Sequence, residues 1–277
     1  MIRGTTRVAA VIGWPVEHSR SPQMFAAAFA QAGLDAVMIP IGVPPEAFAQ
    51  VVGALGAMRA LGASVTLPHK LAAAALCDEL SPAARAIGAV NCLSFAGGRV
   101  SGHNTDAEGF TDSLIAAGFA PAGKRCVILG AGGAARAVAY GLAASGASRV
   151  EVIARRPDEV SWATARPWTA GQLAESFARA DLVVDSTPLG LTDADVQAID
   201  ALPLDALGGG AWVSTLIYHR ATRLIERAHR RGLATLDGRG MLVHQGARQL
   251  ALWTGVAPPV GAMRAALDAS LSAPGAA

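Results

Sequence analysis

The chain has 277 residues, which is enough for two domains that each bury a hydrophobic core. A hydrophobic content of 52% excludes a disordered chain. A net charge of +2 and an aromatic content of 5% argue against a surface for nucleic acid or for an anionic membrane.

The sequence also lacks the marks of a membrane span, a targeting segment or a metal site. Its apolar runs fall short of the roughly 18 residues of a membrane-spanning helix, and residues 1–7 lack the apolar centre of a signal peptide. The three cysteines lie far apart without metal-binding or redox spacing, so we expect buried thiols in a reducing compartment. We therefore expect a cytoplasmic protein that binds no metal, no nucleic acid and no membrane.

In the first hundred residues, short apolar runs alternate with helical patterns. The predicted strands are 8–12, 36–41 and 63–67, and the predicted helices are 22–32, 45–55, 69–77 and 81–87. A hairpin of residues 88–95 and 99–102, turning at Gly97-Gly98, follows. This alternation predicts an α/β fold with a mainly parallel sheet covered on both faces.

Three residues near the ends of these elements are candidates for chemistry. Ser21 before Pro22 has the pattern of a helix N-cap. Lys70 stands in the first turn of a predicted helix, where its charge opposes the helix dipole. It is either solvated or directed into a cleft at the carboxyl end of a strand, where open α/β sheets bind ligands. Asp106 precedes a helical pattern at 110–117, and a cap is the commoner role for an aspartate that enters a helix.

The second half begins with the pattern of a dinucleotide-binding fold. Apolar residues 126–129 run into Gly130-Ala-Gly-Gly133, and a helical pattern follows. Gly130 permits a tight turn, Gly132 lets the backbone approach a pyrophosphate, and Ala135 takes the small position where helix packs on strand. The N–H groups and the positive dipole end of that helix would then face the phosphates.

Strands and helices continue to alternate after this turn, as in a Rossmann-type domain. The predicted strands are 125–129, 149–153, 181–185, 211–217 and 233–236, and the predicted helices are 133–144, 169–178 and 222–231. Two further helices, 240–254 and 259–271, follow, and residues after 272 are expected to fray. We place the domain boundaries at 1–105 for a first α/β domain, 106–237 for the Rossmann-type domain and 238–277 for helices that pack back on the first domain.

The residues after the second strand of this domain indicate NADP(H) rather than NAD(H). NAD-binding domains usually carry an acidic residue at the end of that strand, whereas Glu151 lies early in it and should not reach the loop. Arg155 and Arg156 supply positive charge where a 2′-phosphate would lie, and a guanidinium matches phosphate geometry. The alternative is that both are ordinary surface arginines.

Six segments, in the same order, resemble the shikimate dehydrogenase family over nearly the whole chain. They are GWPVEHSRSP at 13–22, SVTLPHK at 64–70, GAVN at 88–91, GHNTD at 102–106, GAGGAAR at 130–136, and GMLVHQ at 240–245 followed by WTG at 253–255. The resemblance implies a two-domain α/β oxidoreductase that interconverts 3-dehydroshikimate and shikimate with NADP as its cofactor.

The resemblance also implies residue roles. Lys70 and Asp106 would be the catalytic pair, with Lys70 as acid/base at the substrate oxygen and Asp106 orienting both lysine and substrate. The implied substrate-binding residues are Ser19, Ser21, Thr66, Lys70, Asn91, Asp106, Tyr218 and Gln245. The implied cofactor-binding residues are Gly130, Ala131, Gly132, Gly133, Ala134, Arg155, Thr187, Leu216, Gly238 and Met241. Ala154 and Arg156 stand where the family has Asn and Thr, and Arg156 is added as a cofactor-binding residue because of its charge.

The chain departs from the family pattern at several places. Ser64 and Asp185 each stand where the family commonly has Asn, and Phe25-Ala26 replaces a His-Asn pair. The segment 212–222 lacks an Asp three residues before Tyr218 and a Pro after it, and it is one residue short. These departures put the substrate in more doubt than the chemistry.

Other functions therefore stay open. A paralogue could act on quinate or a related cyclic hydroxy acid, and a catalytically silent module could bind NADPH for regulation. A folate dehydrogenase of similar build is a further option, although it would not need Ser19, Ser21 and Gln245 together. The sequence does not decide between these substrates, between strict and relaxed use of NADP, or the protonation state of Lys70. It also leaves the oligomeric state open, with a homodimer through the apolar first sheet as one possibility.

Overall fold

The computed structural model describes residues 2–272, except for the side chain of residue 193. It divides into two compact units, of which the first combines residues 2–109 with residues 243–272 and the second is Phe110–Leu242. Two helices, α5 (Asp106–Ala116) and α10 (Arg239–Thr254), each have residues in both units. The predicted fraying after residue 272 lies outside the described residues. Among the described helices, none combines the length and apolar character needed to cross a bilayer.

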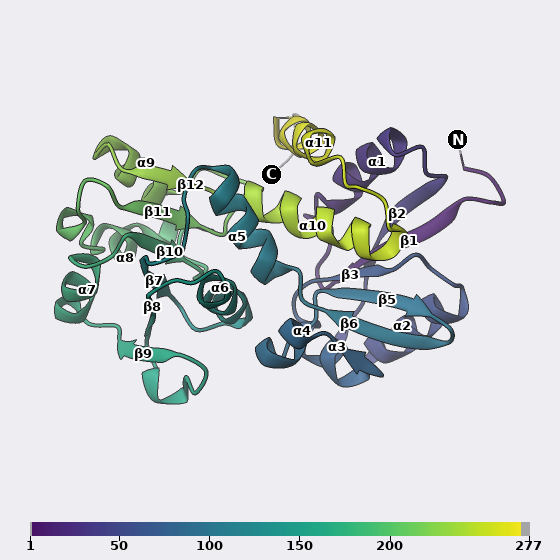
Figure 1. Cartoon of the computed structure of the whole chain (residues 1–277), viewed down its shortest axis with the longest axis horizontal. Helices are drawn as coiled ribbons and strands as arrows, with labels where there is room; N and C mark the ends of the chain where they lie inside the picture. Colours follow the sequence, from purple (N-terminus) through teal and green to yellow (C-terminus); the bar gives the residue numbers. More distant parts are fainter. Residues whose placement is uncertain (1, 273–277) are drawn as a thin grey trace. The chain divides into compact units, whose positions relative to one another are not determined.

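The first unit contains a six-stranded sheet in the order β2-β1-β3-β5-β6-β4 (Figure 1). Its strands are β1 (Arg7–Gly13), β2 (Ala36–Gly42), β3 (Ala63–Val65), β4 (Glu79–Leu80), β5 (Cys92–Ala96) and β6 (Arg99–His103). β1 pairs in parallel with β2 and β3, and β4 with β6, whereas β5 runs antiparallel to β3 and β6. The carboxyl ends of β1, β3 and β6 and the amino end of β5 therefore lie at one edge of the sheet.

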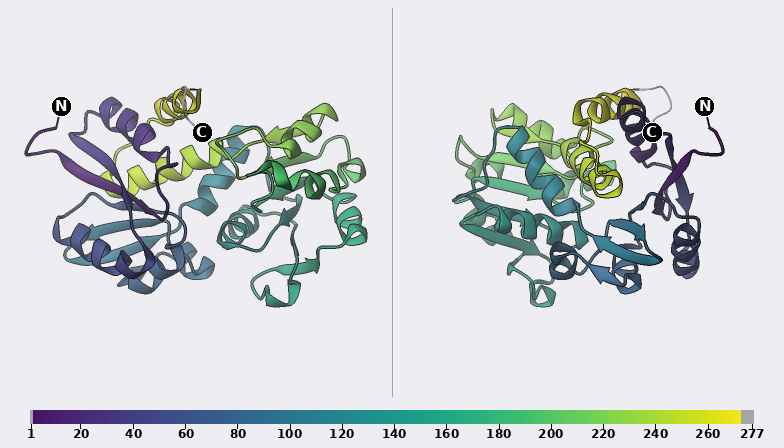
Figure 2. Two further views of the ribbon diagram at one scale, coloured as in Figure 1. Left: turned by 180° about the vertical axis from the view of Figure 1, so that it is seen from behind. Right: turned by 45° about the vertical axis from the view of Figure 1, so that its right-hand side comes forward.

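Helices cover this first sheet. They are α1 (Ser21–Gln31), α2 (Phe48–Ala57) preceded by the 3₁₀ turn η1 (Pro45–Ala47), α3 (Lys70–Leu76), α4 (Pro82–Ile87), the later turns of α10, and α11 (Val260–Ser272). Helices α2, α3 and α4 bury Val52, Ala73 and Ala84 in one cluster with the strands. Helix α1 lies beside α11, as Figures 1 and 2 show from different sides. One expectation is wrong: Ser21 is the first residue of α1, not its N-cap.

The second unit contains a fully parallel six-stranded sheet in the order β12-β11-β10-β7-β8-β9. Its strands are β7 (Arg125–Leu129), β8 (Arg149–Ala154), β9 (Thr164–Pro167), β10 (Leu182–Asp185), β11 (Trp212–Thr215) and β12 (Ala234–Leu236). Numbered within the unit and read from β9, the order is 3-2-1-4-5-6, which is the Rossmann order. The predicted Rossmann-type fold is confirmed.

Helices pack on both faces of this second sheet. They are the later turns of α5, α6 (Gly133–Ala144), α7 (Ala170–Phe177), α8 (Val196–Asp200), α9 (Arg223–Arg230) and the first turn of α10, with the 3₁₀ turns η2 (Pro157–Glu159), η3 (Asp193–Asp195) and η4 (Leu204–Ala206). Residues of α5 and α6 form one hydrophobic cluster with the strands, and residues of α7, α8 and α9 form another. Strand β9 and helix α8 were not predicted. Pro167 is a residue that argues against a strand, and the polar segment around residue 195 shows no apolar helical period.

Candidate active site

Polar side chains of the first unit meet at the sheet edge where β1, β3 and β6 end and β5 begins. The turn after β3 leads into Lys70 at the start of α3, and Asn91 directly precedes β5. Asp106 opens α5 three residues after β6 ends at His103. Because β3, β5 and β6 are neighbours in the sheet, three segments that are far apart in sequence come together here.

Lys70 and Asp106 form a short ion pair. The Nζ of Lys70 lies 2.6 Å from Oδ2 of Asp106, and the two side chains are 22% and 9% exposed. Only two of the 23 basic residues in the chain are lysines, Lys70 and Lys124. This matters because an arginine cannot release its proton in a protein, whereas a lysine can. The pair can therefore hold or transfer a proton, which an Arg–Asp pair could not do.

Asn91 connects this ion pair to helix α10. Its Nδ2 donates to Oδ1 of Asp106 at 2.8 Å and lies 3.3 Å from Oε1 of Gln245. Its Oδ1 accepts the backbone N–H of Thr105 at 2.7 Å. Since Asn91, Thr105 and Asp106 are buried, water does not compete for these bonds, and the Asp106 carboxylate is held in one orientation.

The other predicted substrate-binding residues are placed as follows. Ser19 lies in the loop after β1, and its Oγ accepts the backbone N–H of Ser21 at 3.3 Å. Thr66 follows β3, and its backbone N–H donates to Ile12 in β1 at 2.9 Å. These residues thus lie at the same sheet edge as Lys70. Tyr218 belongs to the second unit, so its part in substrate binding stays a prediction.

Several buried polar residues in and around this network were not predicted. Ser64, on β3, donates its hydroxyl to Oε1 of Gln249, which lies one turn after Gln245 on α10. Asn104 accepts the backbone N–H of Asp106 at 3.1 Å and so provides the cap at the start of α5. His69 is buried, bonds the carbonyl of Val43 at 2.7 Å and stacks on a phenylalanine ring. The four-residue spacing from Gln245 to Gln249 was the signal in the sequence that could have revealed the second glutamine.

The second unit has a pocket of about 690 Å³ at the carboxyl ends of its strands. It is lined by the glycine turn after β7, by the residues after β8 and by those after β10. The predicted cofactor residues in its lining are Gly130, Ala131, Gly132, Arg155, Arg156 and Thr187. The pocket spans β7 and β10, which are the two strands where the sheet order reverses and where Rossmann domains bind dinucleotides.

The residues of this pocket fit a dinucleotide with a 2′-phosphate. Gly130 has φ of 96°, and a Cβ there would lie 2.9 Å from the methyl carbon of Thr187, so only glycine suits this position. Gly132 is the N-cap of α6, whose first N–H groups can bind phosphate. Arg155 and Arg156 both line the pocket on the side formed by the residues after β8. Arg155 is exposed, and Arg156 pairs with Glu159 at 2.9 Å.

The remaining predicted cofactor residues lie outside the lining of this pocket. Gly133 and Ala134 open α6. A Cβ on Gly238 would lie 2.1 Å from the carbonyl oxygen of Leu216, so these two predicted residues are in tight contact. Met241 packs against the hydrophobic cluster that contains α6. Their role toward the cofactor stays a prediction.

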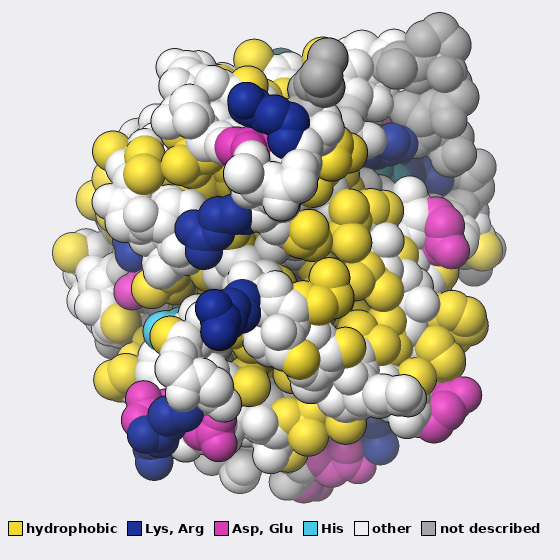
Figure 3. Space-filling model, turned by 90° about the vertical axis from the view of Figure 1, so that its right-hand side faces the viewer, with side chains coloured by type: hydrophobic (Ala, Val, Ile, Leu, Met, Phe, Trp, Pro, Cys, Tyr) yellow, Lys and Arg dark blue, Asp and Glu magenta, His cyan; other side chains and the backbone are white. Residues whose placement is uncertain are grey.

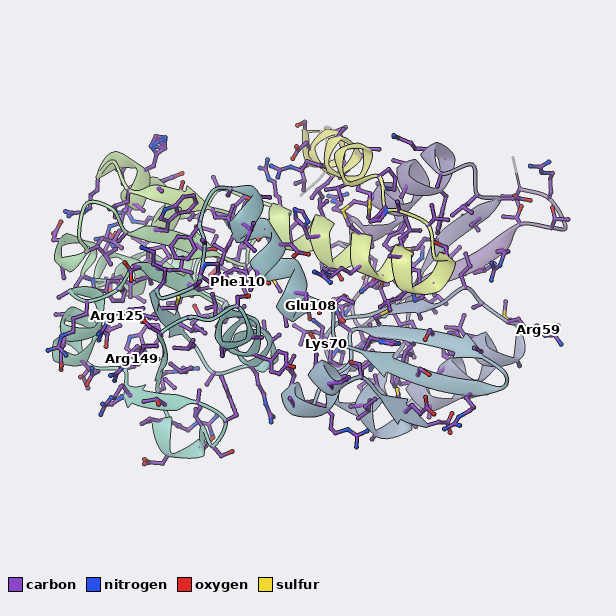
Figure 4. The ribbon with its side chains drawn as sticks, in the orientation of Figure 1. Arg59, Lys70, Glu108, Phe110, Arg125 and Arg149 are labelled. Carbon is purple, nitrogen blue, oxygen red and sulfur yellow. The ribbon has the colours of Figure 1, made fainter. Side chains whose placement is uncertain are left out.

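Glu151 does not reach the loop after β8 that contains Arg155 and Arg156, as predicted. Its side chain is buried, pairs with Arg149 at 2.9 Å and accepts a bond from Ser176 on α7. These groups line a smaller pocket of about 260 Å³ at the amino ends of β7 and β8, where Arg125 and Arg149 are labelled in Figure 4. Strand β8 ends in an alanine rather than in an acidic residue, which agrees with NADP as the cofactor.

Asp185, at the end of β10, is a buried carboxyl next to Thr187, which lines the pocket. Its Oδ1 accepts the backbone N–H of Thr187 at 2.9 Å and the Thr187 hydroxyl at 2.6 Å. Burial raises the pKa of Asp185 to about 6, although the bonds from Thr187 oppose this shift. The residue thus fixes Thr187 against the glycine turn.

Comparisons with known proteins agree with the geometry of both units. The model of the shikimate dehydrogenase substrate binding domain matches residues 11–93, and that of the shikimate 5′-dehydrogenase C-terminal domain matches residues 238–267. A shikimate dehydrogenase (NADP(+)) of Citrifermentans bemidjiense is 39% identical over 289 aligned positions, which cover 99% of each chain.

Solved structures give the same result. The shikimate 5-dehydrogenase of Thermus thermophilus, in complex with NADP(H) and shikimate, is 35% identical with a TM-score of 0.85, covering 95% of this chain and 99% of that one. A quinate dehydrogenase of Corynebacterium glutamicum, in complex with NAD, is 28% identical with a TM-score of 0.85, covering 95% and 99%. The resemblance found in the sequence is confirmed, and the chain belongs to the shikimate dehydrogenase family.

Proposed function

We propose that the protein is an NADP-dependent oxidoreductase that interconverts 3-dehydroshikimate and shikimate. The observation that carries this proposal is the Lys70–Asp106 ion pair, held by Asn91 in the first unit of a chain whose second unit has a pocket suited to NADP. Full-length relatives named shikimate dehydrogenase (NADP(+)) support both the substrate and the cofactor.

In this proposal the chain's own residues manage the proton. NADP supplies hydride transfer when it is bound. Lys70 Nζ donates a proton to the ketone oxygen of 3-dehydroshikimate during reduction and accepts the hydroxyl proton of shikimate during oxidation. Asp106 holds the ammonium in place through Oδ2, while Asn91 holds the other carboxylate oxygen.

The remaining residues bind and orient the two ligands. Ser19 and Ser21 bind the substrate carboxylate, with Tyr218 as a helper, and Thr66, Asn91 and Gln245 bind ring hydroxyls. Gly130 to Ala134 hold the pyrophosphate of NADP, and Arg155 and Arg156 bind its 2′-phosphate. The remaining proposed cofactor contacts are Thr187, Leu216, Gly238 and Met241.

The direct test is the oxidation of shikimate by the purified protein with NADP, followed by the absorbance of NADPH. We expect turnover with shikimate and NADP, and a lower kcat/KM when NAD replaces NADP. Absence of turnover, or a higher kcat/KM with NAD, would reject the corresponding part of the proposal.

A second candidate substrate is quinate. The observation that favours it is the departure of Ser64 from the Asn usual in the family, because Ser64 belongs to the hydrogen-bond network of the site, together with the likeness to a quinate dehydrogenase. Assays with shikimate, quinate and aminoshikimate side by side decide between the substrates by the ratio of their kcat/KM values.

We also propose a cytoplasmic location and a homodimer. The location is supported by the three cysteines, which are free thiols in the described residues. The homodimer is supported by the outer edge of β2, where Ile39 is 37% exposed, and by the broad area of hydrophobic side chains in Figure 3. Light scattering during gel filtration tests the dimer, and a monomeric mass at all concentrations would exclude it.

A further inference from the structure

Gln249 is a completely buried amide beside the proposed substrate site. It has 0% exposure and lies one helical turn after Gln245 on α10. Its Nε2 lies 2.7 Å from Oε1 of Gln245, 3.1 Å from the backbone carbonyl oxygen of Asn91 and 3.3 Å from Oγ1 of Thr105. Its own Oε1 accepts the hydroxyl of Ser64.

The chemistry of these neighbours fixes which way the Gln249 amide faces. A backbone carbonyl only accepts hydrogen bonds, so the Gln249 atom beside the Asn91 carbonyl must be the amide nitrogen. That nitrogen is then also the donor to Gln245, and Gln245 must turn its Oε1 toward it. The hydroxyl of Ser64 supplies the matching donor for the other end of Gln249.

A second donor of fixed orientation meets the same oxygen of Gln245. Oδ1 of Asn91 accepts the backbone N–H of Thr105 at 2.7 Å, so the Nδ2 of Asn91 is the group that lies 3.3 Å from Oε1 of Gln245. Two amide nitrogens of fixed orientation therefore lie within hydrogen-bond distance of this one oxygen, and that of Asn91 also lies 2.8 Å from Oδ1 of Asp106 and 3.0 Å from Oγ1 of Thr105. The amide plane of Gln245 then directs its Nε2 away from Gln249 and Asn91.

We propose that Gln249 is a positioning residue that, together with Ser64, fixes the orientation of Gln245 so that the substrate site presents an amide N–H donor. The inference rests on the proposed function, in which Gln245 binds a ring hydroxyl. A substrate hydroxyl can donate to the Asp106 carboxylate and accept from an amide N–H. If the Gln245 amide were rotated by 180°, the hydroxyl would face its Oε1, which only accepts hydrogen bonds. Gln249 itself has no access to substrate because it is fully buried.

The test compares Gln249→Met with wild type and with Leu250→Met, a matched substitution at the neighbouring buried position of α10. We expect Gln249→Met to raise the KM for shikimate about 5- to 10-fold, the effect of one misplaced hydrogen bond, with a smaller change in kcat and none in the KM for NADP. Leu250→Met should leave both KM values near those of wild type.

A double-mutant cycle separates positioning from a general effect on the core. If Gln249 acts through Gln245, then Gln245→Met/Gln249→Met should have the same KM for shikimate as Gln245→Met alone. Additive effects, or an unchanged KM in a folded Gln249→Met, would overturn the proposal. Should Gln249→Met fail to fold, Ser64→Ala takes its place in the same cycle, with an expected rise of about twofold.

A measurement without substrate distinguishes this inference from the proposed function. In ¹H–¹⁵N spectra, the side-chain amide signals of Gln245, assigned by their loss in Gln245→Met, should shift toward those of an exposed glutamine in Gln249→Met. Unmoved signals would reject the positioning role, whatever the substrate is. Absence of shikimate turnover by wild type would reject only the function.

Discussion

Lys70 and Asp106 are thirty-six positions apart in the sequence, yet the lysine Nζ and the aspartate Oδ2 are 2.6 Å apart in the fold. The hairpin of β5 and β6 accounts for this approach. The chain leaves the sheet edge where α3 begins along β5 and returns to the same edge along β6. Lys70 lies at the start of α3 and is labelled in Figure 4. The pair is the feature of the structure whose substitution should have the largest effect on catalysis.

Replacing Lys70 by alanine should lower kcat for shikimate oxidation by about 10²–10⁴-fold, the usual contribution of general acid–base catalysis. Lys70→Arg should lose activity to a similar degree, because it keeps the charge but cannot release the proton. Lys124→Ala is the control, since that lysine pairs with Asp181 in the second unit. Steady-state kinetics measure the effect, and an unaltered kcat in Lys70→Ala would remove this residue from the mechanism.

Replacing Arg155 by alanine should raise the KM for NADP about tenfold or more, because a hydrogen bond between charged groups is lost. The KM for NAD should change little, since NAD has no 2′-phosphate. Arg179→Ala, an exposed arginine paired with Glu175, serves as control. An equal rise in the KM values for NADP and NAD would show that Arg155 does not bind the 2′-phosphate.

Replacing Asp185 by asparagine should change how stability depends on pH. Burial raises the pKa of this carboxyl from 3.8 to about 6, so the folded state binds more protons than the unfolded state between these values. The free energy of unfolding should therefore fall as pH rises through this window, by about 3 kcal/mol if Asp185 acts alone. Asp185→Asn should lose this slope and be more stable than wild type near neutral pH.

Urea unfolding at a series of pH values measures the effect of Asp185→Asn. The oxygen of an asparagine can still accept both bonds from Thr187. The substitution therefore removes the ionisable group but keeps these two hydrogen bonds. If wild type and variant have parallel stability curves from acid to neutral pH, then Asp185 is not the group responsible.

Replacing Gly62 by alanine should destabilise the first unit by about 2–4 kcal/mol. A Cβ at Gly62 would lie 2.1 Å from Nε1 of Trp253, and this indole is buried and bonded to the carbonyl of Leu93. Thermal unfolding measures the change. Gly53→Ala on α2, where a Cβ would meet nothing within 4 Å, should instead be neutral or stabilising by about 0.5–1 kcal/mol.

Much of the fold could be predicted where local chemistry decides it. The helix at 133–144 was placed correctly because glycines mark its start and an apolar stripe marks its length. Helix α5 begins at Asp106, four residues before the predicted start. The cap is the side chain of Asn104, which bonds the N–H of Asp106, and a polar HNTD segment gave no apolar period from which to recognise this turn.

The site was less accessible to sequence reasoning than the fold. Spacing alone could not pair Lys70 with Asp106, because the pairing depends on how β3, β5 and β6 are ordered in the sheet. The resemblance to a known family supplied that link. Gln249 escaped attention because a glutamine on a helix is usually solvated, and only the packing of α10 against β3 and β5 makes it a buried part of the network.

The first unit is built from segments on both sides of the second unit in the sequence, with residues 243–272 completing what residues 2–109 begin. On the ribosome, the whole of Phe110–Leu242 must be translated before Gln245, Gln249 and helix α11 become available to the nascent sheet. The residues proposed to bind substrate can therefore assemble only after the second unit has been synthesised. A chain terminated before residue 243 would keep its glycine turn but would leave α1 without helix α11, and Phe25 on α1 without the ring of Trp253.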